Sequence, residues 1–409
     1  MTRRIIAIGF VFCCCTLAWI LLGGTVTFRT HRQDARLRDA VGQLWGTSQI
    51  QRAPLLYWTE SESAHTPAAY LRETENPEER NFLPLLSSRI DVDLQLDHRR
   101  KGLLWYSTYR VDFDAAYRVE NSTPEPRRLI FDFPLPSSQA VYDGFTLAVG
   151  DTEVPAPTIL SGRLLHALQL QPGQSQTLRL SYRSQGLDEW RYRFGNQTEK
   201  VDDFQLTVHT DFDRIDFPRQ TISPLQEETT ATGWKLIWRY DRLLTGADLG
   251  LALPQKLNPG PWVSQVCFAA PISLFLFFFL LFLITTIGEI RLHPMHYFFI
   301  GAAFFSFHLL LAYLVDHLSI HASFAICSLV SLFLVVSYVR LVVGLRFALI
   351  RVGLAQVIYQ VLFSCTFFFP GYTGLAITAL SIVTLFAAMQ FTGRVDWENL
   401  FRRDCANTP

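Results

Sequence analysis

The sequence is poor in charged residues and has no excess of either sign. Of its 409 residues, 36 are Lys or Arg and 36 are Asp or Glu, so the formal net charge is zero. Charged residues make up 18% of the chain, whereas soluble domains average about 25%. A balanced charge argues against a nucleic-acid binder and against an acidic tail.

The few charges are also unevenly placed. Residues 1–28 contain 2, residues 29–256 contain 58 and residues 257–409 contain 12. A single soluble globule does not separate its charges in this way. The distribution therefore indicates a membrane protein with one large polar module, and it argues against a soluble cytoplasmic enzyme.

Cysteine is absent from the polar module. None occurs between residues 29 and 256, although the chain has 7 in total. The module therefore folds without disulfides, even on the oxidising side of a membrane. It is long enough to bury its own core. Its 27 positive and 31 negative side chains argue against a polybasic surface for anionic lipid or nucleic acid.

The motifs of common enzymes are missing as well. The chain has no Gly-rich phosphate loop, nucleophile elbow, Cys-x-x-Cys pair or His-Glu-x-x-His. Neighbouring carboxylates in the polar module are expected on the solvated face of strands and not in acid-base catalysis; they are Asp202, Asp203, Asp211 and Asp213. We therefore expect no enzyme, no catalytic residues, no metal and no cofactor.

Long uncharged runs predict six transmembrane helices. A helix needs about 20 apolar residues to cross a hydrocarbon core of roughly 30 Å. The run from residue 352 to residue 393 is long enough for two helices, which Pro370 and Gly371 divide. The predicted spans are residues 1–28 and then about 262–287, 294–315, 319–340, 347–369 and 372–392, the last five within a membrane region of residues 261–393.

Arginine sets the expected orientation, because Lys and Arg are retained in short loops on the cytoplasmic side. If the N-terminus is cytoplasmic, every Lys or Arg outside the polar module falls on that side. We expect both termini to be cytoplasmic, with residues 29–260 on the far side and residues 394–409 as a cytoplasmic tail. The first span lacks a clear cleavage site, so we expect a retained anchor. The arginines are Arg3, Arg4, Arg291, Arg340, Arg346, Arg351, Arg394, Arg402 and Arg403.

The exported module is predicted to be rich in β-strands. A short helix is expected after residue 30 and a polar loop over residues 60–79. Beyond the loop, about eight segments alternate apolar and polar residues, among them DVDLQLDH and GWKLIWRYDRLL. A period of two is typical of strands with one buried face. We therefore expect a sandwich-like all-β domain inserted between the first two spans.

Histidine gathers in the membrane half of the chain. His293 and His296 are three residues apart in RLHPMHY, which suits either two metal ligands or a polar cap at the start of the third span. We favour the cap. His308 lies about 18 Å of helix beyond His296. It therefore falls in the apolar part of the span, where ionisable groups are costly and often functional.

Two interpretations of His308 stay open. In the first, His308 and Asp316, about 12 Å apart along the helix, belong to a proton or ion relay completed by water or by other polar groups. In the second, which we favour, the same residues form a structural network between helices. Asp316 and His317 end the third span. The polar residues available to either arrangement are Tyr313, Gln356, Tyr359, Gln360 and Gln390.

The third span and its surroundings resemble the CreD family of bacterial inner-membrane proteins. The resemblance rests on RLHPMHYFFIGAAFFSFHLLLAYLVDH, on SYVRLVVGLRFAL and on the closing GRVDW. Upstream, RRKGLLWY and GWKLIW match more loosely. Asp316 stands where the family more often has Glu, which retains the charge. The resemblance implies a bacterial cytoplasmic membrane and a role in cell-envelope integrity and envelope stress, and it supplies no catalytic residues.

The sequence thus predicts an α-helical polytopic membrane protein with a large inserted extracytoplasmic β-domain. The first functional hypothesis is a non-enzymatic envelope-integrity protein whose exported domain binds a cell-envelope protein or glycan. The alternative is a transporter or ion-coupled translocation component that uses His308 and Asp316. A third and weaker hypothesis is a membrane enzyme with a metal at His293 and His296. Neither nucleic acid nor a cofactor is expected as a partner.

Overall fold

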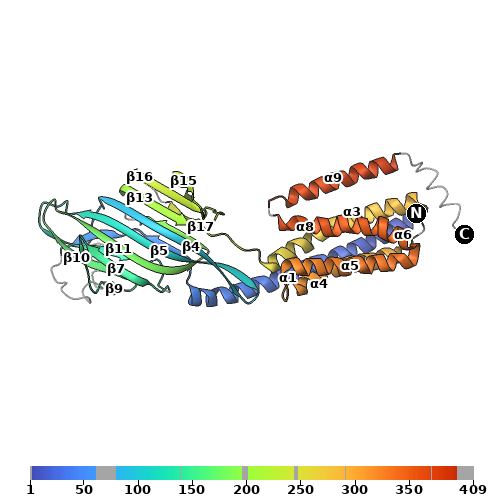
Figure 1. Ribbon diagram of the computed structural model, residues 1–409, viewed down its shortest axis with the longest axis horizontal. Coiled ribbons are helices and arrows are strands. Elements are labelled where there is room, and N and C mark those ends of the chain that lie inside the picture. Colours follow the sequence, from blue (N-terminus) through green and yellow to red (C-terminus); the bar gives the residue numbers. More distant parts are fainter. Residues whose placement is uncertain are drawn as a thin grey trace. The chain divides into compact units, whose positions relative to one another are not determined.

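The chain forms two compact units in the computed structural model (Figure 1). The membrane domain consists of residues 1–35 and 257–409, and the β-domain of residues 36–256. The structure describes residues 2–60, 80–138, 140–195, 201–243, 247–290, 292–369 and 371–393. The predictions on the loop after residue 60, on Arg291 and Pro370, and on the tail from residue 394 lie outside the described residues.

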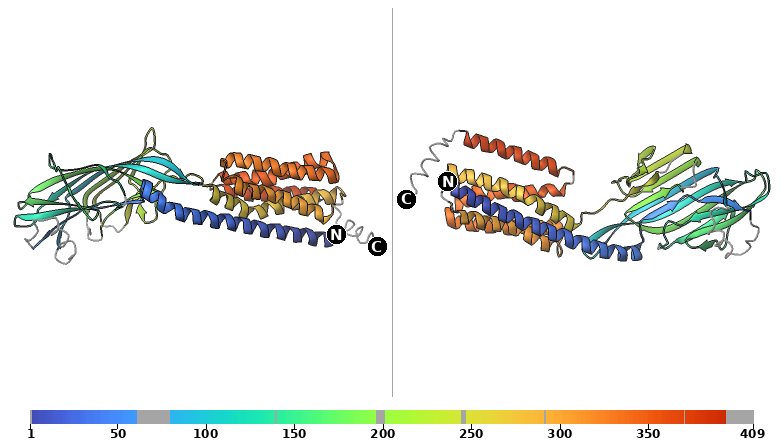
Figure 2. Two further views of the ribbon diagram at one scale, coloured as in Figure 1. Left: turned by 90° about the horizontal axis from the view of Figure 1, so that it is seen from below. Right: turned by 180° about the vertical axis from the view of Figure 1, so that it is seen from behind.

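The described part of the chain contains six helices long and apolar enough to cross a membrane, and within the membrane domain they run side by side (Figure 2). The expected set of membrane-spanning helices is therefore confirmed by length and composition. Their bounds are α1 (Thr2–Trp45), α3 (Pro259–Ile287), α4 (Pro294–Leu314), α5 (Ile320–Val343), a fifth span over residues 345–368 and α9 (Thr373–Thr392).

The first helix is longer than the sequence predicted. The expected span and the short helix after it form one continuous helix of 44 residues. No proline interrupts residues 25–45. Thr25 and Thr27 bond their hydroxyls to carbonyls four residues earlier, at 2.7 Å and 2.9 Å, so they add polar contacts within the helix. The helix ends only at Gly46, whose φ is +91°.

The fifth span departs from regular α-helix. It runs through α6 (Leu345–Phe347), the π-helical η2 (Ala348–Gly353), α7 (Leu354–Gln356), the π-helical η3 (Val357–Leu362), α8 (Phe363–Cys365) and the 3-10 turn η4 (Thr366–Phe368). π-Helical turns are rare and frequent at functional sites. They also rotate the following side chains relative to a period of 3.6, so the faces of this span were not readable from sequence.

The β-domain contains seventeen strands in its described residues, about twice the predicted number. Several edge strands have only two to five residues, too few to show a period. The strands are β1 (Gln49–Arg52), β2 (Leu55–Thr59), β3 (Arg80–Leu83), β4 (Ser87–Lys101), β5 (Leu104–Glu120), β6 (Arg127–Pro134), β7 (Asp143–Val149), β8 (Thr152–Glu153), β9 (Thr158–Leu160), β10 (Arg163–Leu170), β11 (Ser175–Leu187), β12 (Glu189–Arg193), β13 (Val201–Thr210), β14 (Thr221–Ile222), β15 (Gln226–Thr229), β16 (Trp234–Leu243) and β17 (Asp248–Ala252).

These strands form three sheets instead of the two of a simple sandwich. The largest has the order β15-β16-β13-β4-β5-β11-β7-β8, and the others are β3-β2-β6-β10-β9 and β1-β12-β17-β14. A single hydrophobic core joins all three, since it includes Val92 of β4, Phe131 of β6 and Trp190 of β12, all fully buried. Burial alternates strictly over much of β4, so one face of the large sheet packs on the core while the other carries its polar residues.

Gly46 is predicted to be a sensitive position of the β-domain. A Cβ at residue 46 would lie 2.2 Å from the carbonyl oxygen of Gln185, and the backbone is left-handed. Gly162 also has a positive φ, +74°, but open space around it. Gly46→Ala should therefore lower stability by about 3 kcal/mol or more, and Gly162→Ala by about 1 kcal/mol.

Thermal unfolding of the full chain in detergent, followed by tryptophan fluorescence, measures the difference. We expect midpoint shifts of the β-domain of about 6–12 °C for Gly46→Ala and about 2–4 °C for Gly162→Ala. Equal shifts in the two variants would contradict the close contact between Gly46 and Gln185.

Candidate functional sites

His308 lies in an aromatic environment. It is 1% exposed, and its ring centroid is 5.3 Å from that of Trp19 on α1 and 4.8 Å from that of Phe307. Within the described residues, neither Nδ1 of His308 nor Nε1 of Trp19 has a hydrogen-bond partner. His308 thus contributes ring packing between α1 and α4, and no polar chain extends from it.

The polar contacts of the membrane interior gather at Ser331, Gln356 and Gln360, which we call the polar node. All three side chains are fully buried. Nε2 of Gln356 lies 2.8 Å from Oε1 of Gln360 and 3.0 Å from Oγ of Ser331. Ser331 Oγ is 2.9 Å from the same Oε1. Lipid offers no partners, so these groups bond to one another, although Oε1 of Gln356 has no partner among the described residues.

The polar node also binds the backbone of α4. Nε2 of Gln360 donates to the carbonyl of Phe304 at 2.7 Å, and Ser331 lies 2.8 Å from the carbonyl of Ala303. The node therefore ties α4, α5 and the fifth span together. Both glutamines lie at or beside the π-helical segment η3, where the turn geometry brings them to one buried face.

Tyr359, next to Gln360, extends the contacts of the fifth span to two more helices. Its hydroxyl is 2.7 Å from that of Thr384 on α9, and its carbonyl accepts a hydrogen bond from Ser273 of α3. The fifth span thus bonds to four other helices. Gln356, Tyr359 and Gln360 were predicted from the sequence as polar residues available here. Ser331 was not predicted, because a small serine within an apolar helix does not by itself indicate a polar contact.

Asp316 has a cationic partner. Nη1 of Arg29 lies 3.0 Å from Oδ2 of Asp316, and Nη2 donates to the carbonyl of Ala312 at 3.0 Å. The guanidinium also lies over the ring of Tyr313. Arg29 thus binds the middle part of α1 to the end of α4. His317, the next residue, is exposed.

The structure does not join His308 to Asp316. Of the residues named for such a relay, Gln356 and Gln360 bond to Ser331, Tyr359 bonds to Thr384, and Tyr313 and Gln390 are exposed. Polar contacts do join the helices, as the structural interpretation expected, but His308 is not among them.

His293 and His296 serve separate local contacts. Nδ1 of His293 accepts from the backbone amide of Met295 at 3.3 Å, which makes His293 the N-cap of α4. Nδ1 of His296 lies 2.8 Å from the hydroxyl of Tyr338 on α5. No group of three or more His, Cys, Asp or Glu side chains is arranged to hold a metal ion in the part of the chain that the structure describes.

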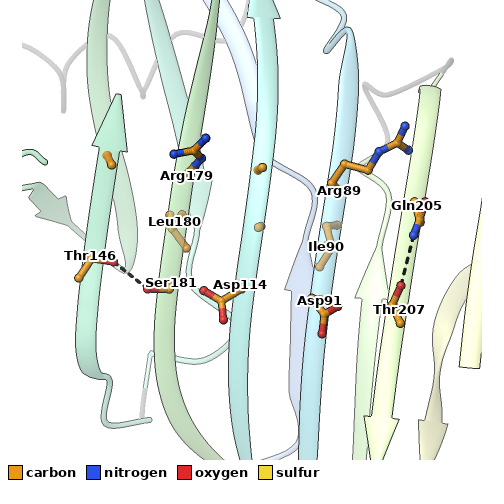
Figure 3. A pocket seen from close by; sticks show the side chains of 13 residues that line it. Arg89, Ile90, Asp91, Asp114, Thr146, Arg179, Leu180, Ser181, Gln205 and Thr207 are labelled. Carbon is orange, nitrogen blue, oxygen red and sulfur yellow. Dashed lines mark hydrogen bonds between the residues drawn. The ribbon is translucent and has the colours of Figure 1, made fainter. Parts of the chain in front are cut away.

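The β-domain has a hollow on the exposed face of its large sheet. Its volume is about 330 Å³, and it crosses five adjacent strands, β13, β4, β5, β11 and β7 (Figure 3). Ala116 and Ala148 are small side chains between longer ones, and this difference in length makes the depression. The polar residues that line it are Arg89, Asp91, Asp114, Thr146, Arg179, Ser181, Gln205 and Thr207.

Two rows of side chains run across the hollow. In one row, Ala116 pairs with Arg89 on β4 and with Arg179 on β11. In the next, Asp114 pairs with Asp91 on β4 and with Ser181 on β11. Rows two residues apart along a strand are separated by about 7 Å. The hollow therefore offers guanidinium groups at one end and carboxylates at the other.

The carboxylates of the hollow face one another. Asp91 is directly opposite Asp114 and, outside the hollow, Asp93 is directly opposite Asp112. Like charges in direct cross-strand pairs are destabilising. Partial burial raises the pKa of Asp114, with Asp91 and Asp112 adding to the effect. Burial and the charge of Asp112 likewise raise the pKa of Asp93. The carboxylates thus repel one another in the folded domain, and His209, whose Nε2 lies 3.6 Å from Oδ1 of Asp91, offsets this repulsion when it is protonated.

The two arginines of the hollow differ in how strongly they are held by ion pairs. Arg89 is fixed by Asp203, with both carboxylate oxygens 2.8 Å from Nη2. Arg179 is 3.6 Å from Asp151, whose side chain is 99% exposed, so this ion pair is weak. Arg179 is thus available to a ligand. The sequence indicated only a solvated face here, because strand pairing is needed to place these residues together.

Comparison with protein families identifies the membrane half. Residues 269–398 match the family model described as inner membrane protein CreD. The match covers about a third of the chain, and over this segment the sequence is similar to that family. The resemblance expected from the sequence is thereby confirmed. The CreD match begins within α3 and extends past α9, so it includes the polar node, His308 and Asp316.

Comparisons with individual proteins add little. No curated protein matches the sequence significantly. Among solved structures, a protein from Legionella pneumophila described as nutrient-binding has 12% identity and a TM-score of 0.33, covering 55% of this chain and 74% of its own. A variant of an M1 zinc metallopeptidase from Deinococcus radiodurans has 12% identity and a TM-score of 0.27, covering 41% of each chain. Both likenesses are too distant to support a shared function.

The contacts of His308 and Gln360 predict different effects of the same substitution. Gln360→Leu removes bonds to Phe304, Gln356 and Ser331, and intramembrane hydrogen bonds contribute about 0.6 kcal/mol each on average. We expect a loss of about 2 kcal/mol and a lower abundance in the membrane. His308→Leu removes no contact with the polar node and leaves an apolar side chain in the same aromatic environment, so the loss of stability should be smaller than in Gln360→Leu.

Unfolding of the purified variants by a denaturing detergent, beside their abundance in cells, measures both effects. A destabilised His308→Leu with an unaffected Gln360→Leu would contradict this assignment. Loss of function in His308→Leu at normal abundance would instead support the relay.

Proposed function

We propose that this CreD-family protein supports cell-envelope integrity without catalysis, by binding another envelope protein through the hollow of its β-domain. The proposal rests on the chemistry of the hollow. It combines a guanidinium available to a ligand, opposed carboxylates and hydroxyl groups on a rigid sheet. A partner with complementary charges would relieve the repulsion between Asp91 and Asp114.

A bacterial inner membrane, with both termini in the cytoplasm, is part of the proposal. The contact of Arg4 with Thr285 and Tyr297 supports it, because it puts the start of α1, the end of α3 and the start of α4 at one end of the membrane domain. Arg29 and Asp316 meet at the other end. With basic residues retained inside, the β-domain then lies on the periplasmic side, where envelope proteins are accessible.

A protein partner fits the hollow better than a glycan does. The thirteen described residues that line it include no aromatic side chain, so no ring is available there for a sugar to stack on. Charged and hydroxyl groups on a flat sheet suit a polar protein surface, where electrostatic complementarity sets specificity and the rate of association.

The transport hypothesis receives less support from the membrane domain. Asp316 is paired with Arg29, and the side chains of the polar node bond to one another and to the backbone of α4. These contacts join helices. We therefore assign the membrane domain the role of an anchor that holds the β-domain.

Photo-crosslinking in cells tests the binding surface. A photoreactive amino acid at Thr146, on the rim of the hollow, should give one specific adduct. The same group at Ser161, in the turn after β9 on another sheet, should give none. Ala116→Trp, which fills the hollow, should abolish the adduct and reduce survival under a sublethal β-lactam to that of cells without the protein.

Gln95→Trp is the matched control, since Gln95 is exposed on β4 outside the hollow. It should retain both the adduct and survival. Full survival of Ala116→Trp at normal abundance, or equal adducts from Thr146 and Ser161, would contradict the proposed role of the hollow.

A further inference from the structure

A second cavity lies in the membrane domain, between the first turns of α1 and the start of α4. Its volume is about 630 Å³, which is within the range of small-molecule sites. Residues spaced by three and four along α1 form one wall, so they share a face of the helix. The lining residues are Arg3, Ile6, Ala7, Phe10 and Val11 of α1, and Pro294, Met295 and Phe298 of α4. We call this the α1–α4 groove.

The helices that form the groove are parallel. Arg4 contacts Tyr297 near the start of both helices, Trp19 packs against Phe304 farther along, and Arg29 pairs with Asp316 at the far end. The two N-terminal ends are therefore at the same end of the membrane domain. Ala7 is the smallest side chain of the α1 wall, and larger side chains border the space beside it.

Positive charge is concentrated at one end of the groove. Arg3 is exposed and is the one charged residue among the eight that line it. Both helix N-termini carry a partial positive charge, and neither helix has an acidic residue in its first turn. Arg4 is turned inward to Thr285 and Tyr297, so Arg3 is the guanidinium that an external anion meets.

The remainder of the groove is apolar and has the length of an acyl chain segment. From Arg3 to Val11 the helix rises about 12 Å, close to half of a hydrocarbon core of roughly 30 Å. Phe10, Met295 and Phe298 are available for contact with a chain that runs down from Arg3. A free anion would make contacts only at the charged end of the groove. An uncharged lipid would make contacts only with its apolar walls.

We propose that the α1–α4 groove is a binding site for one anionic phospholipid, with its phosphate at Arg3 and the two helix N-termini and one acyl chain between Phe10, Met295 and Phe298. The site is independent of the hollow in the β-domain. A lipid bound in the groove would link α1 to α4, two helices that the whole β-domain separates along the chain.

Native mass spectrometry of the full-length protein, released from nanodiscs of phosphatidylglycerol and phosphatidylcholine, tests the proposal. The wild type should retain one phosphatidylglycerol in preference to phosphatidylcholine. Arg3→Gln should reduce this retention about fivefold, and Arg3→Lys should largely restore it. Ala7→Phe, which fills the groove, should reduce the retention of both lipids.

Arg346→Gln is the matched control, because Arg346 is an exposed arginine of α6 that does not line the groove. It should retain lipid as the wild type does. Equal losses in Arg3→Gln and Arg346→Gln, or no preference for phosphatidylglycerol in the wild type, would overturn the proposal. Displacement of the lipid by millimolar inorganic phosphate would also overturn it, since the acyl chain would then contribute nothing.

Discussion

The absence of hydrogen-bonding partners in lipid is the constraint on which the membrane domain depends. A buried amide or hydroxyl must find its partner inside the protein. Gln360, Ser331 and the amide nitrogen of Gln356 do so by bonding to one another, and Gln360 and Ser331 also bond to the backbone of α4. The irregular fifth span is central because its π-helical turns present these groups to its neighbours. Without it, α3, α4, α5 and α9 would be held largely by apolar packing, which lipid tails match closely.

The β-domain is surrounded by water, so it buries its apolar side chains and exposes its charged ones. The large sheet buries one face in a core shared with two smaller sheets, and its other face is free to carry charge. On that face, side-chain length shapes the surface: Ala116 lies between Arg89 and Arg179, and a hollow results. The opposed pair of Asp91 and Asp114 is unfavourable within the domain alone, which is why we connect it with a partner.

The sequence predicted those features that depend on composition along the chain. The membrane-spanning helices, the β-rich module and the CreD resemblance all follow from runs, periods and short motifs. The number of strands, the length of α1 and the π-helical turns were not predictable, because they depend on packing between distant segments. His308 shows the same limit: its position in the span was clear, but only the structure puts it beside Trp19 and apart from Asp316.

The candidate sites also differ in whether they depend on local sequence or on contacts between distant segments. His293 as a helix cap is a local feature, and its position before Pro294 indicated it. The polar node and the hollow join residues from three and five elements, and no spacing along the chain brings them together. Strand register in particular decides which carboxylates face one another, and a shift by one residue would have moved them all to the other face.

In the proposed topology the β-domain lies across the membrane from the chain termini, and labelling with a membrane-impermeant maleimide tests this orientation. The β-domain has no native cysteine, whereas Cys405 lies near the C-terminus. In intact spheroplasts, the double variant Ser161→Cys, Cys405→Ser should be labelled at once, and the wild type only after lysis. Labelling of the wild type at Cys405 before lysis, with a protected residue 161, would show the opposite orientation.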